Sequence, residues 1–184
     1  MQTEKQKMLA GDRYKADDPI LAAERQQART LCRELAALPP ADTARAQALL
    51  ARLFGAATDA CITPPFFCDY GYNIQLGANV YFNVNCVVLD VMPVAIGDNT
   101  LFGPGVHIYT ALHPTGAAER RLGLEFARPV TIGADVWVGG SAVVCPGVSI
   151  GAGTVIGAGS VVTRDIPPGV FAAGNPCRVI RRLP

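Results

Sequence analysis

The sequence predicts a mostly β protein: a parallel β-helix of hexapeptide repeats, with a short α-helical N-terminal segment and one extended loop. Three observations lead to this prediction. An apolar residue recurs at every sixth position over much of the chain, the first fifty-odd residues follow helical patterns, and the repeat pauses for about twenty residues. We assign residues 1–58 to the helical segment and 59–184 to the β-helix, with the inserted loop at 110–129.

The N-terminal segment carries start and stop signals for three helices. Thr3 and the glutamine three residues later form a capping box, and Asp18 followed by Pro19 suits an N-cap and first helical position. Asp42 can cap a third helix that Gly55 ends. We expect the second and third helices each to bury one apolar face. These faces comprise Leu21, Ala28, Leu31, Leu35 and Leu38, and then Leu49, Leu50, Leu53 and Phe54.

A strict period of six follows the inserted loop. It fits neither an α-helix nor simple strand alternation, and it is typical of solenoids in which three hexapeptides close one coil. The branched side chain of each hexapeptide points into the coil, so several coils must stack to bury the interior. Before the loop the period is less regular, with a two-residue slip near Met92 and Pro93 that predicts a bulge or a turn insertion. The strict positions are Ile132, Val138, Val144, Ile150, Ile156 and Val162; the earlier ones are Leu76, Phe82, Val88, Ile96, Phe102 and Ile108.

The inserted loop at 110–129 interrupts the period, and insertions in solenoids often build the binding face. It carries His113, one of only two histidines in the chain. A histidine there could be a general base or a loop residue without a task, and the residues alone leave both possibilities open. The other histidine, His107, precedes inward-facing Ile108 in a slot that points outward, so we expect it on the surface.

Composition limits the classes of function. The 184-residue chain is 50% hydrophobic and has a net charge of +1, which favours one sizeable core and neither nucleic-acid nor membrane-surface binding. The start, Met1 to Lys7, is polar without an apolar stretch behind it, and no apolar run reaches the length of a membrane span. The six cysteines form no CxxC pair. We expect them to be small buried hydrophobes of a reducing compartment, with a cytoplasmic location.

Four stretches resemble the maltose and galactoside O-acetyltransferases, the sugar branch of the hexapeptide acyltransferases. The first, MLAGDRYKADDPILAAER, looks like the helical domain that precedes the β-helix in that branch. YFNVNCVVLDV and GVHIYTALHP look like the coils leading to the catalytic histidine, and IGAGSVVTRDIPPGVFAAGNPCRVIRRL resembles the coenzyme A end. The resemblance runs nearly end to end. It implies a left-handed coil, whereas the general crossover rule would favour a right-handed one.

The resemblance also implies an activity and an assembly. The chain would transfer an acetyl group from acetyl-CoA to a hydroxyl of a sugar such as maltose, glucose or a galactoside, without a metal. It would form a homotrimer with active sites between subunits. His113 would be the general base, with Glu125 as a candidate to orient its other ring nitrogen. Asn83 matches the asparagine that stabilises the tetrahedral oxyanion, although asparagine is also a common turn residue.

Coenzyme A would lie in the groove between neighbouring subunits. Glycine and alanine there would let the pantetheine arm approach the backbone, and arginines would face the phosphates. Trp137 either flanks the arm or fills a corner between subunits. The positions that match the family's coenzyme contacts are Gly140, Ala158, Thr163, Arg164, Arg178 and Arg181. The candidate acceptor contacts are Asp17, Asp69 and Tyr81, each of which could instead be a cap, turn or coil residue.

The chain departs from the galactoside members in three places. Asp69 and Gly140 stand where those members carry serines, and Leu89-Asp90-Val91 lacks their second acidic residue. The last departure favours the maltose branch. Two alternatives stay open: an acyltransferase for an amine on an antibiotic or nucleotide sugar, and a non-catalytic solenoid scaffold. A β-helix carbonic anhydrase would hold zinc with three histidines. The chain has two, so the sequence argues against this class.

Overall fold

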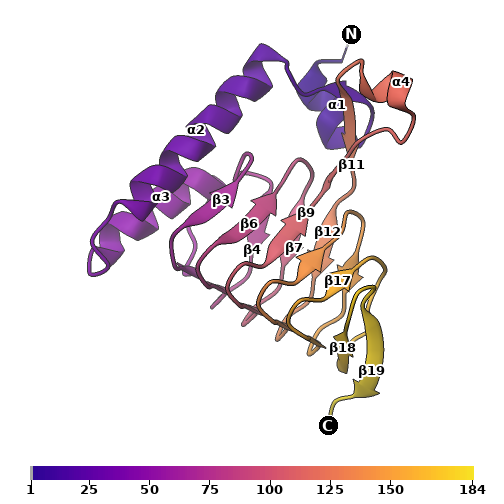
Figure 1. The fold of residues 1–184 in the computed structure, drawn as a ribbon. Coiled ribbons are helices and arrows are strands. Elements are labelled where there is room, and N and C mark those ends of the chain that lie inside the picture. Colours follow the sequence, from indigo (N-terminus) through magenta and orange to yellow (C-terminus); the bar gives the residue numbers. More distant parts are fainter. Residues whose placement is uncertain (1) are drawn as a thin grey trace.

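A computed structural model of the chain describes residues 2–184 and consists of stacked three-sided coils with helices at the N-terminal end (Figure 1). Each complete coil adds one strand to each of three parallel faces. The seven-stranded face contains β2 (Cys61–Ile62), β5 (Tyr81–Phe82), β8 (Leu101–Phe102), β13 (Trp137–Val138), β16 (Val155–Ile156), β18 (Val170–Ala173) and the antiparallel β19 (Arg178–Arg182). The five-stranded face contains β3 (Phe66–Cys68), β6 (Cys86–Leu89), β9 (His107–Tyr109), β14 (Val143–Val144) and β17 (Val161–Val162). The four-stranded face contains β4 (Ile74–Leu76), β7 (Val94–Ile96), β12 (Val130–Ile132) and β15 (Ser149–Ile150).

The hexapeptide period produces this stacking, as predicted. The six strict positions are each no more than 2% exposed, and parallel pairing places equivalent positions of successive coils on top of one another. Inside the coils the rings of Phe82 and Phe102 stack with centroids 4.4 Å apart. The two-residue slip lies in the corner between β6 and β7, and β7 still pairs in register with β4 and β12. The slip is therefore a turn insertion, and the strands on both sides of it keep their register.

The helices begin at the predicted residues. Thr3 completes its capping box, the Asp18 carboxylate accepts two backbone N–H groups, and Asp42 accepts one. Gly55 ends the third helix in the left-handed conformation, with φ of 71°. The helices are α1 (Glu4–Ala10), α2 (Pro19–Ala36) and α3 (Thr43–Phe54).

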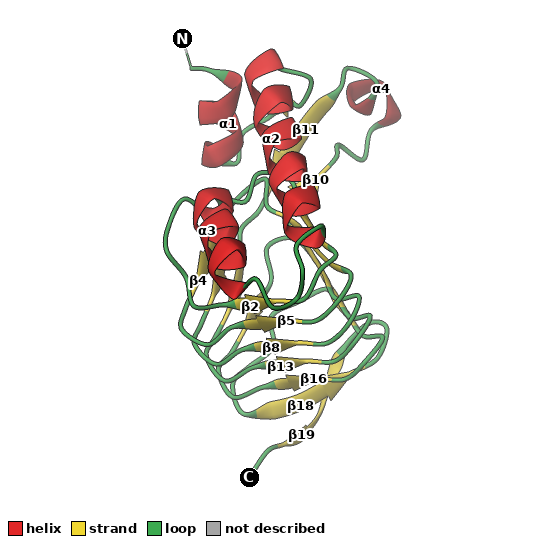
Figure 2. Ribbon diagram, turned by 90° about the vertical axis from the view of Figure 1, so that its left-hand side faces the viewer, coloured by secondary structure: helices red, strands yellow, loops and turns green. Residues whose placement is uncertain are grey.

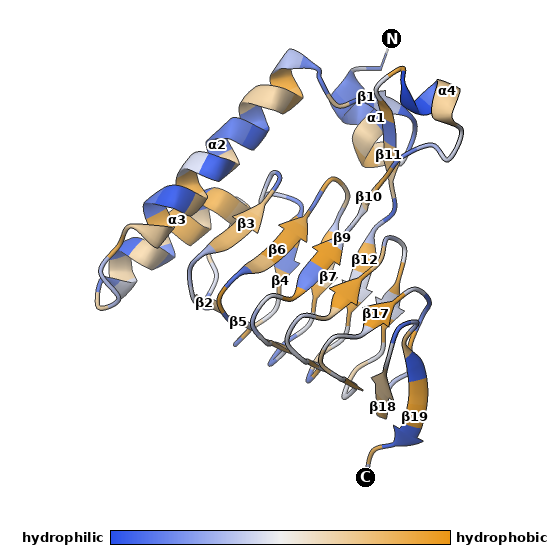
Figure 3. Ribbon diagram, viewed as in Figure 1, coloured by the Kyte–Doolittle hydropathy of each residue, from blue (hydrophilic) through white to orange (hydrophobic). Residues whose placement is uncertain are grey.

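The apolar sides of α2 and α3 cover the open N-terminal end of the coils (Figure 2). Leu31, Leu35 and Phe54 belong to the same buried cluster as the coil interior, and the Phe54 ring packs edge-on against Phe66 with centroids 6.4 Å apart. Figure 3 shows hydrophilic residues along much of α2, whereas the strands of the coils are predominantly apolar. The helical segment therefore caps the core, because a single end coil cannot bury its own interior.

The inserted segment, which we call the arm (residues 110–129), lies outside the coils and contains regular elements. It contains β10 (Ala111–Leu112), α4 (Ala117–Arg120) and β11 (Leu124–Ala127), and β10 and β11 form an antiparallel hairpin. Strand β1 (Tyr14–Lys15) of the N-terminal segment pairs with the other side of β11. The arm is ordered by this pairing, which joins it to the helical segment.

The cysteine prediction is correct for four residues and wrong for the others. Cys32, Cys68, Cys86 and Cys177 are buried, Cys145 is half-buried and Cys61 is exposed, because its side chain points outward from β2. All six are free thiols. Within residues 2–184, no helix has the length and apolar character needed to cross a membrane.

Candidate active site

The arm sets His113 opposite a carboxylate. His113 directly follows β10, and Glu125 lies on the partner strand β11. The His113 Nδ1 atom is 4.0 Å from Glu125 Oε1, with 58% of the His113 side chain and 24% of the Glu125 side chain exposed. A carboxylate on the Nδ1 side favours the tautomer with its proton there, which leaves Nε2 as the nitrogen that can accept a proton.

The other carboxylate oxygen of Glu125 has a partner that the sequence reasoning missed. The Tyr14 hydroxyl donates to Glu125 Oε2 at 2.7 Å, and Tyr14 and Glu125 are paired directly across β1 and β11. Tyr14 lies in one of the stretches that carry the family resemblance, but its partner is 111 residues away. Spacing along the chain could not have linked the two residues.

Asp69 follows β3, and the arm leaves the same corner two coils later, after β9. Its loop is held by Asp90, whose side chain is fully buried. The Asp90 carboxylate accepts the backbone N–H groups of Asp69, Tyr70 and Gly71 at 2.9, 2.9 and 2.7 Å. Burial raises the pKa of Asp69, and the positive charges of Arg25 and Arg29 partly oppose this rise. Asp90 therefore acts as an anchor for the backbone that presents Asp69.

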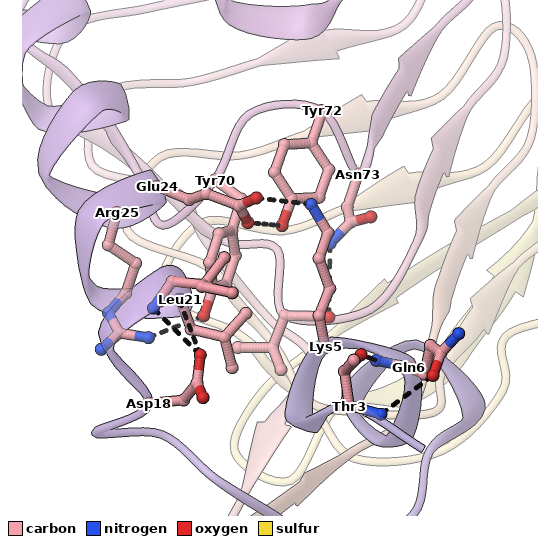
Figure 4. A network of polar contacts seen from close by, with 12 residues as sticks. Thr3, Lys5, Gln6, Asp18, Leu21, Glu24, Arg25, Tyr70, Tyr72 and Asn73 are labelled. Atoms are coloured by element: carbon pink, nitrogen blue, oxygen red, sulfur yellow. Dashed lines mark hydrogen bonds and ion pairs between the residues drawn. The ribbon is translucent and has the colours of Figure 1, made fainter. Parts of the chain in front are cut away.

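Helices α1 and α2 fix the same loop through polar contacts (Figure 4). Arg25 donates to the Tyr70 hydroxyl at 2.7 Å and to the Ala16 carbonyl at 2.6 Å. The Tyr72 hydroxyl donates to Glu24 Oε2 at 2.7 Å, and Lys5 pairs with the other oxygen of Glu24 at 2.7 Å. The contact of Arg25 to the Ala16 carbonyl also braces the turn that carries the exposed Asp17.

Asn83 lies on a different edge of the β-helix, at the corner between the seven- and five-stranded faces. Its Oδ1 accepts the Val84 backbone N–H at 2.8 Å, while among the described residues its Nδ2 has no hydrogen-bond acceptor. The amide N–H groups are thus available to a ligand. Tyr81, on β5 two residues earlier, receives a hydrogen bond from Thr63 at 3.3 Å.

Gly140 and Ala158 occupy the same corner in later coils. A Cβ atom at Gly140 would lie 3.1 Å from the Pro104 carbonyl oxygen, so a larger residue there requires a small shift of the neighbouring backbone. Trp137, on β13 beside this corner, is 55% exposed, and the neighbouring Leu101 on β8 is 46% exposed. The corner and the adjoining strands thus form a surface of small residues bordered by exposed apolar side chains.

The candidate residues therefore fall into two groups on opposite edges of the five-stranded face. One edge, which we call the arm edge, carries the candidate residues that come directly after strands of the five-stranded face or lie on or beside the arm. They are His113, Asp69, Asp17, Thr163 and Arg164. The Asn83 edge and the seven-stranded face carry the others: Asn83, Tyr81, Trp137, Gly140, Ala158, Arg178 and Arg181. One chain does not bring the two groups together.

The last two arginines lie on β19 and are exposed. Arg181 sits over the Phe171 ring, with its guanidinium carbon 5.7 Å from the ring centroid, and Arg178 donates to the Cys177 carbonyl at 2.7 Å. Neither arginine takes part in an ion pair with a described residue, so both charges can face an anion. Across residues 2–184, no three His, Cys, Asp or Glu side chains cluster as metal ligands would.

Family models match both parts of the chain. The "Maltose acetyltransferase hexapeptide capping motif" matches residues 7–58, and the "Bacterial transferase hexapeptide (six repeats)" matches residues 129–164. Among curated proteins, nodulation protein L of Rhizobium meliloti is 49% identical over 179 residues, which cover 96% of this chain and 97% of that protein.

Solved structures agree with these matches over the whole chain. The maltose O-acetyltransferase of Clostridium difficile 630 superposes with a TM-score of 0.97 at 44% identity, covering 100% of this chain and 98% of that one. A galactoside acetyltransferase in complex with coenzyme A gives a TM-score of 0.92 at 37% identity, with coverage of 100% and 92%. The chain therefore belongs to the maltose and galactoside acetyltransferase family of hexapeptide-repeat acyltransferases, and it is an acetyltransferase.

Proposed function

We propose that this acetyltransferase moves the acetyl group of acetyl-CoA to a hydroxyl of a sugar such as maltose, glucose or a galactoside. The observation that carries the proposal is the imidazole–carboxylate pair on the arm, with His113 Nδ1 and Glu125 Oε1 4.0 Å apart. The similar proteins named as maltose and galactoside acetyltransferases, one of them holding coenzyme A, support this choice of acceptor and donor.

In the proposed reaction His113 Nε2 takes the proton of the sugar hydroxyl while the sugar oxygen attacks the thioester carbonyl. The carbonyl oxygen of the tetrahedral intermediate becomes negative, and the free N–H groups of Asn83 stabilise it. When the intermediate collapses, the carbon–sulfur bond breaks and the imidazolium returns the proton to the sulfur of coenzyme A. The products are an O-acetyl sugar and free coenzyme A.

The acceptor and the coenzyme would be held by the remaining candidates. Asp17, Asp69 and Tyr81 would receive sugar hydroxyls, and Trp137 would lie along the pantetheine arm. The phosphates would meet the arginines, since charge-assisted contacts of guanidinium groups suit phosphate oxygens. The full coenzyme set is Gly140, Ala158, Thr163, Arg164, Arg178 and Arg181.

An acceptor screen tests the proposal. Purified protein would be incubated with acetyl-CoA and maltose, glucose, a galactoside, an aminosugar nucleotide and an aminoglycoside, and thiol release and acetylated product would be measured. We expect O-acetylation of the sugars and little transfer to amines. Preferential amide formation would assign the chain to the amine acceptors instead. Failure to bind acetyl-CoA at all would favour a scaffold.

A further inference from the structure

Tyr14 is tied to the arm by both its backbone and its side chain. Its strand β1 pairs antiparallel with β11, with Tyr14 opposite Glu125. The phenol donates to Glu125 Oε2 at 2.7 Å, while Glu125 Oε1 lies 4.0 Å from His113 Nδ1. The two oxygens of one carboxylate therefore face two different partners, and the carboxylate connects the phenol to the imidazole.

The phenol is a fixed donor. Tyr14 is 1% exposed and belongs to a small apolar cluster with Met8, Leu21 and Val91. Burial, and then the hydrogen bond to Glu125, raise the pKa of Tyr14 above its ordinary value, so the hydroxyl keeps its proton over the whole working pH range. Glu125 is partly exposed, so the buried ring is the rigid end of this connection.

We propose that Tyr14 is a positioning residue for acetyl transfer: its hydroxyl holds the Glu125 carboxylate so that Oε1 faces His113 Nδ1. This inference deepens the proposed function and rests on it. The carboxylate keeps the imidazole in the tautomer with the proton on Nδ1, and Nε2 stays free to act as the base. Tyr14 itself neither gains nor loses a proton. The helical segment thus contributes to the reaction as well as capping the core.

The first test compares the phenol that reaches His113 through Glu125 with the phenol that contacts the other histidine, His107. Tyr14→Phe removes the hydroxyl and keeps the ring, and we expect kcat to fall about tenfold, the factor that roughly one hydrogen bond provides. The KM for acetyl-CoA should not change. Tyr109→Phe is the matched control, because the Tyr109 hydroxyl contacts Nδ1 of the other histidine, His107, which has no part in the proposed reaction. We expect Tyr109→Phe to keep normal kcat; equal losses in both variants would overturn the inference.

The second test asks whether Tyr14 acts through Glu125. Tyr14→Phe should lower kcat in the natural background and have no further effect on Glu125→Ala, because the group that the phenol positions is then gone. A loss of the same size in both backgrounds would mean that Tyr14 acts only by supporting the fold, which would overturn the proposal. Thermal unfolding of all the variants provides the control for stability.

The third test does not depend on turnover. The chain has only two histidines, so the imidazole nitrogens can be assigned by ¹⁵N NMR with His107→Ala and His113→Ala as references. With the imidazole neutral, we expect His113 to carry its proton on Nδ1 and to shift toward the Nε2–H tautomer in Tyr14→Phe. An unchanged tautomer would overturn the inference about Tyr14. Normal kcat in His113→Ala would instead overturn the proposed base, so the two failures can be distinguished.

Discussion

The two histidines of this chain differ in their surroundings more than in their exposure. His107 lies in a ladder on the five-stranded face between Val87 and Val143, and its Nδ1 contacts the Tyr109 hydroxyl. The Tyr109 hydroxyl can orient the His107 ring, but it carries no negative charge that would stabilise an imidazolium. His113 faces a carboxylate instead, the group that commonly prepares a histidine to act as a base. Comparing the two histidines therefore tests whether the general base of this chain needs a neighbouring carboxylate.

We therefore expect His113→Ala to lower kcat by about 10²- to 10⁴-fold, the usual contribution of a general base. The variant should keep its fold and bind acetyl-CoA, because His113 is exposed and lies outside the stacked core. His107→Ala should be close to the natural protein in kcat. Steady-state kinetics of both variants, after circular dichroism has verified folding, would check this. If His107→Ala is inactive and His113→Ala keeps its activity, His107 and not His113 is the general base.

The arginines of β19 allow a second test at the level of single residues. Replacing Arg178 or Arg181 with alanine should raise the KM for acetyl-CoA by about ten- to a hundredfold, because each removes a charge-assisted contact to a phosphate. The effect on kcat should be smaller. Arg45→Ala is a suitable control, since Arg45 is an exposed arginine on α3, at the other end of the molecule. An unchanged KM in both β19 variants would mean that these arginines only solvate the C-terminal strand.

Elements made of local patterns could be predicted from the sequence, and elements made of distant contacts could not. The helix caps and the coils depend on residues a few positions apart, so Thr3, Asp18 and the period of six identified them. Strand β1 has only two residues and pairs with β11 more than a hundred positions away. Nothing local marks it as a strand, so the sequence predicts an extended loop at 110–129 without the strand pairing that orders it.

The same distinction applies to the loop that carries Asp69. The sequence placed Asp69 near the acceptor but assigned Asp90 only to a family motif. The structure shows Asp90 as a buried carboxylate that receives three backbone N–H groups from residues 69–71. That arrangement depends on two successive coils lying in register, which brings together residues about twenty positions apart in the sequence.

The environment of the buried Asp90 carboxyl group predicts that the stability of the folded protein depends on pH. Burial raises its pKa to about 7, although the backbone N–H donors lower it. In the unfolded chain the carboxyl titrates near its ordinary value of about 3.9, so between these values the folded protein holds a proton that the unfolded chain has lost. This contribution to stability is fully present below about pH 4 and is lost as the pH rises through about 7.

Asp90→Asn should remove this dependence, because an amide does not titrate. The free energy of unfolding of the natural protein should fall relative to that of the variant by up to about 4 kcal/mol between pH 4 and pH 7. Urea unfolding at a series of pH values would measure the difference. Parallel pH profiles for the two proteins would show that Asp90 stays ionised in the folded state.

At the scale of the whole molecule, the division of the candidate residues between two edges is the main constraint on function. His113 and Arg164 lie on one edge of the five-stranded face, whereas Asn83 and Gly140 lie on the other. If His113 is the base and Asn83 the oxyanion donor, as we propose, the two would come from different chains. Exposed Leu101 and Trp137 next to the Asn83 edge supply apolar area that a second chain could cover. A ring of three chains would join unlike edges and close on itself.

This arrangement predicts rescue between two inactive variants. His113→Ala and Asn83→Ala should each be nearly inactive alone, but chains unfolded and refolded together should form mixed trimers. If each site takes its base from one subunit and its oxyanion donor from the next, about one third of the sites in a mixed trimer contain both natural residues. Activity should therefore reappear on mixing, and light scattering should give the mass of a trimer. A double variant carrying both changes, mixed with either single variant, is the control and should stay inactive. If mixing the single variants restores nothing although mixed trimers form, both residues act within one chain and the shared site is wrong.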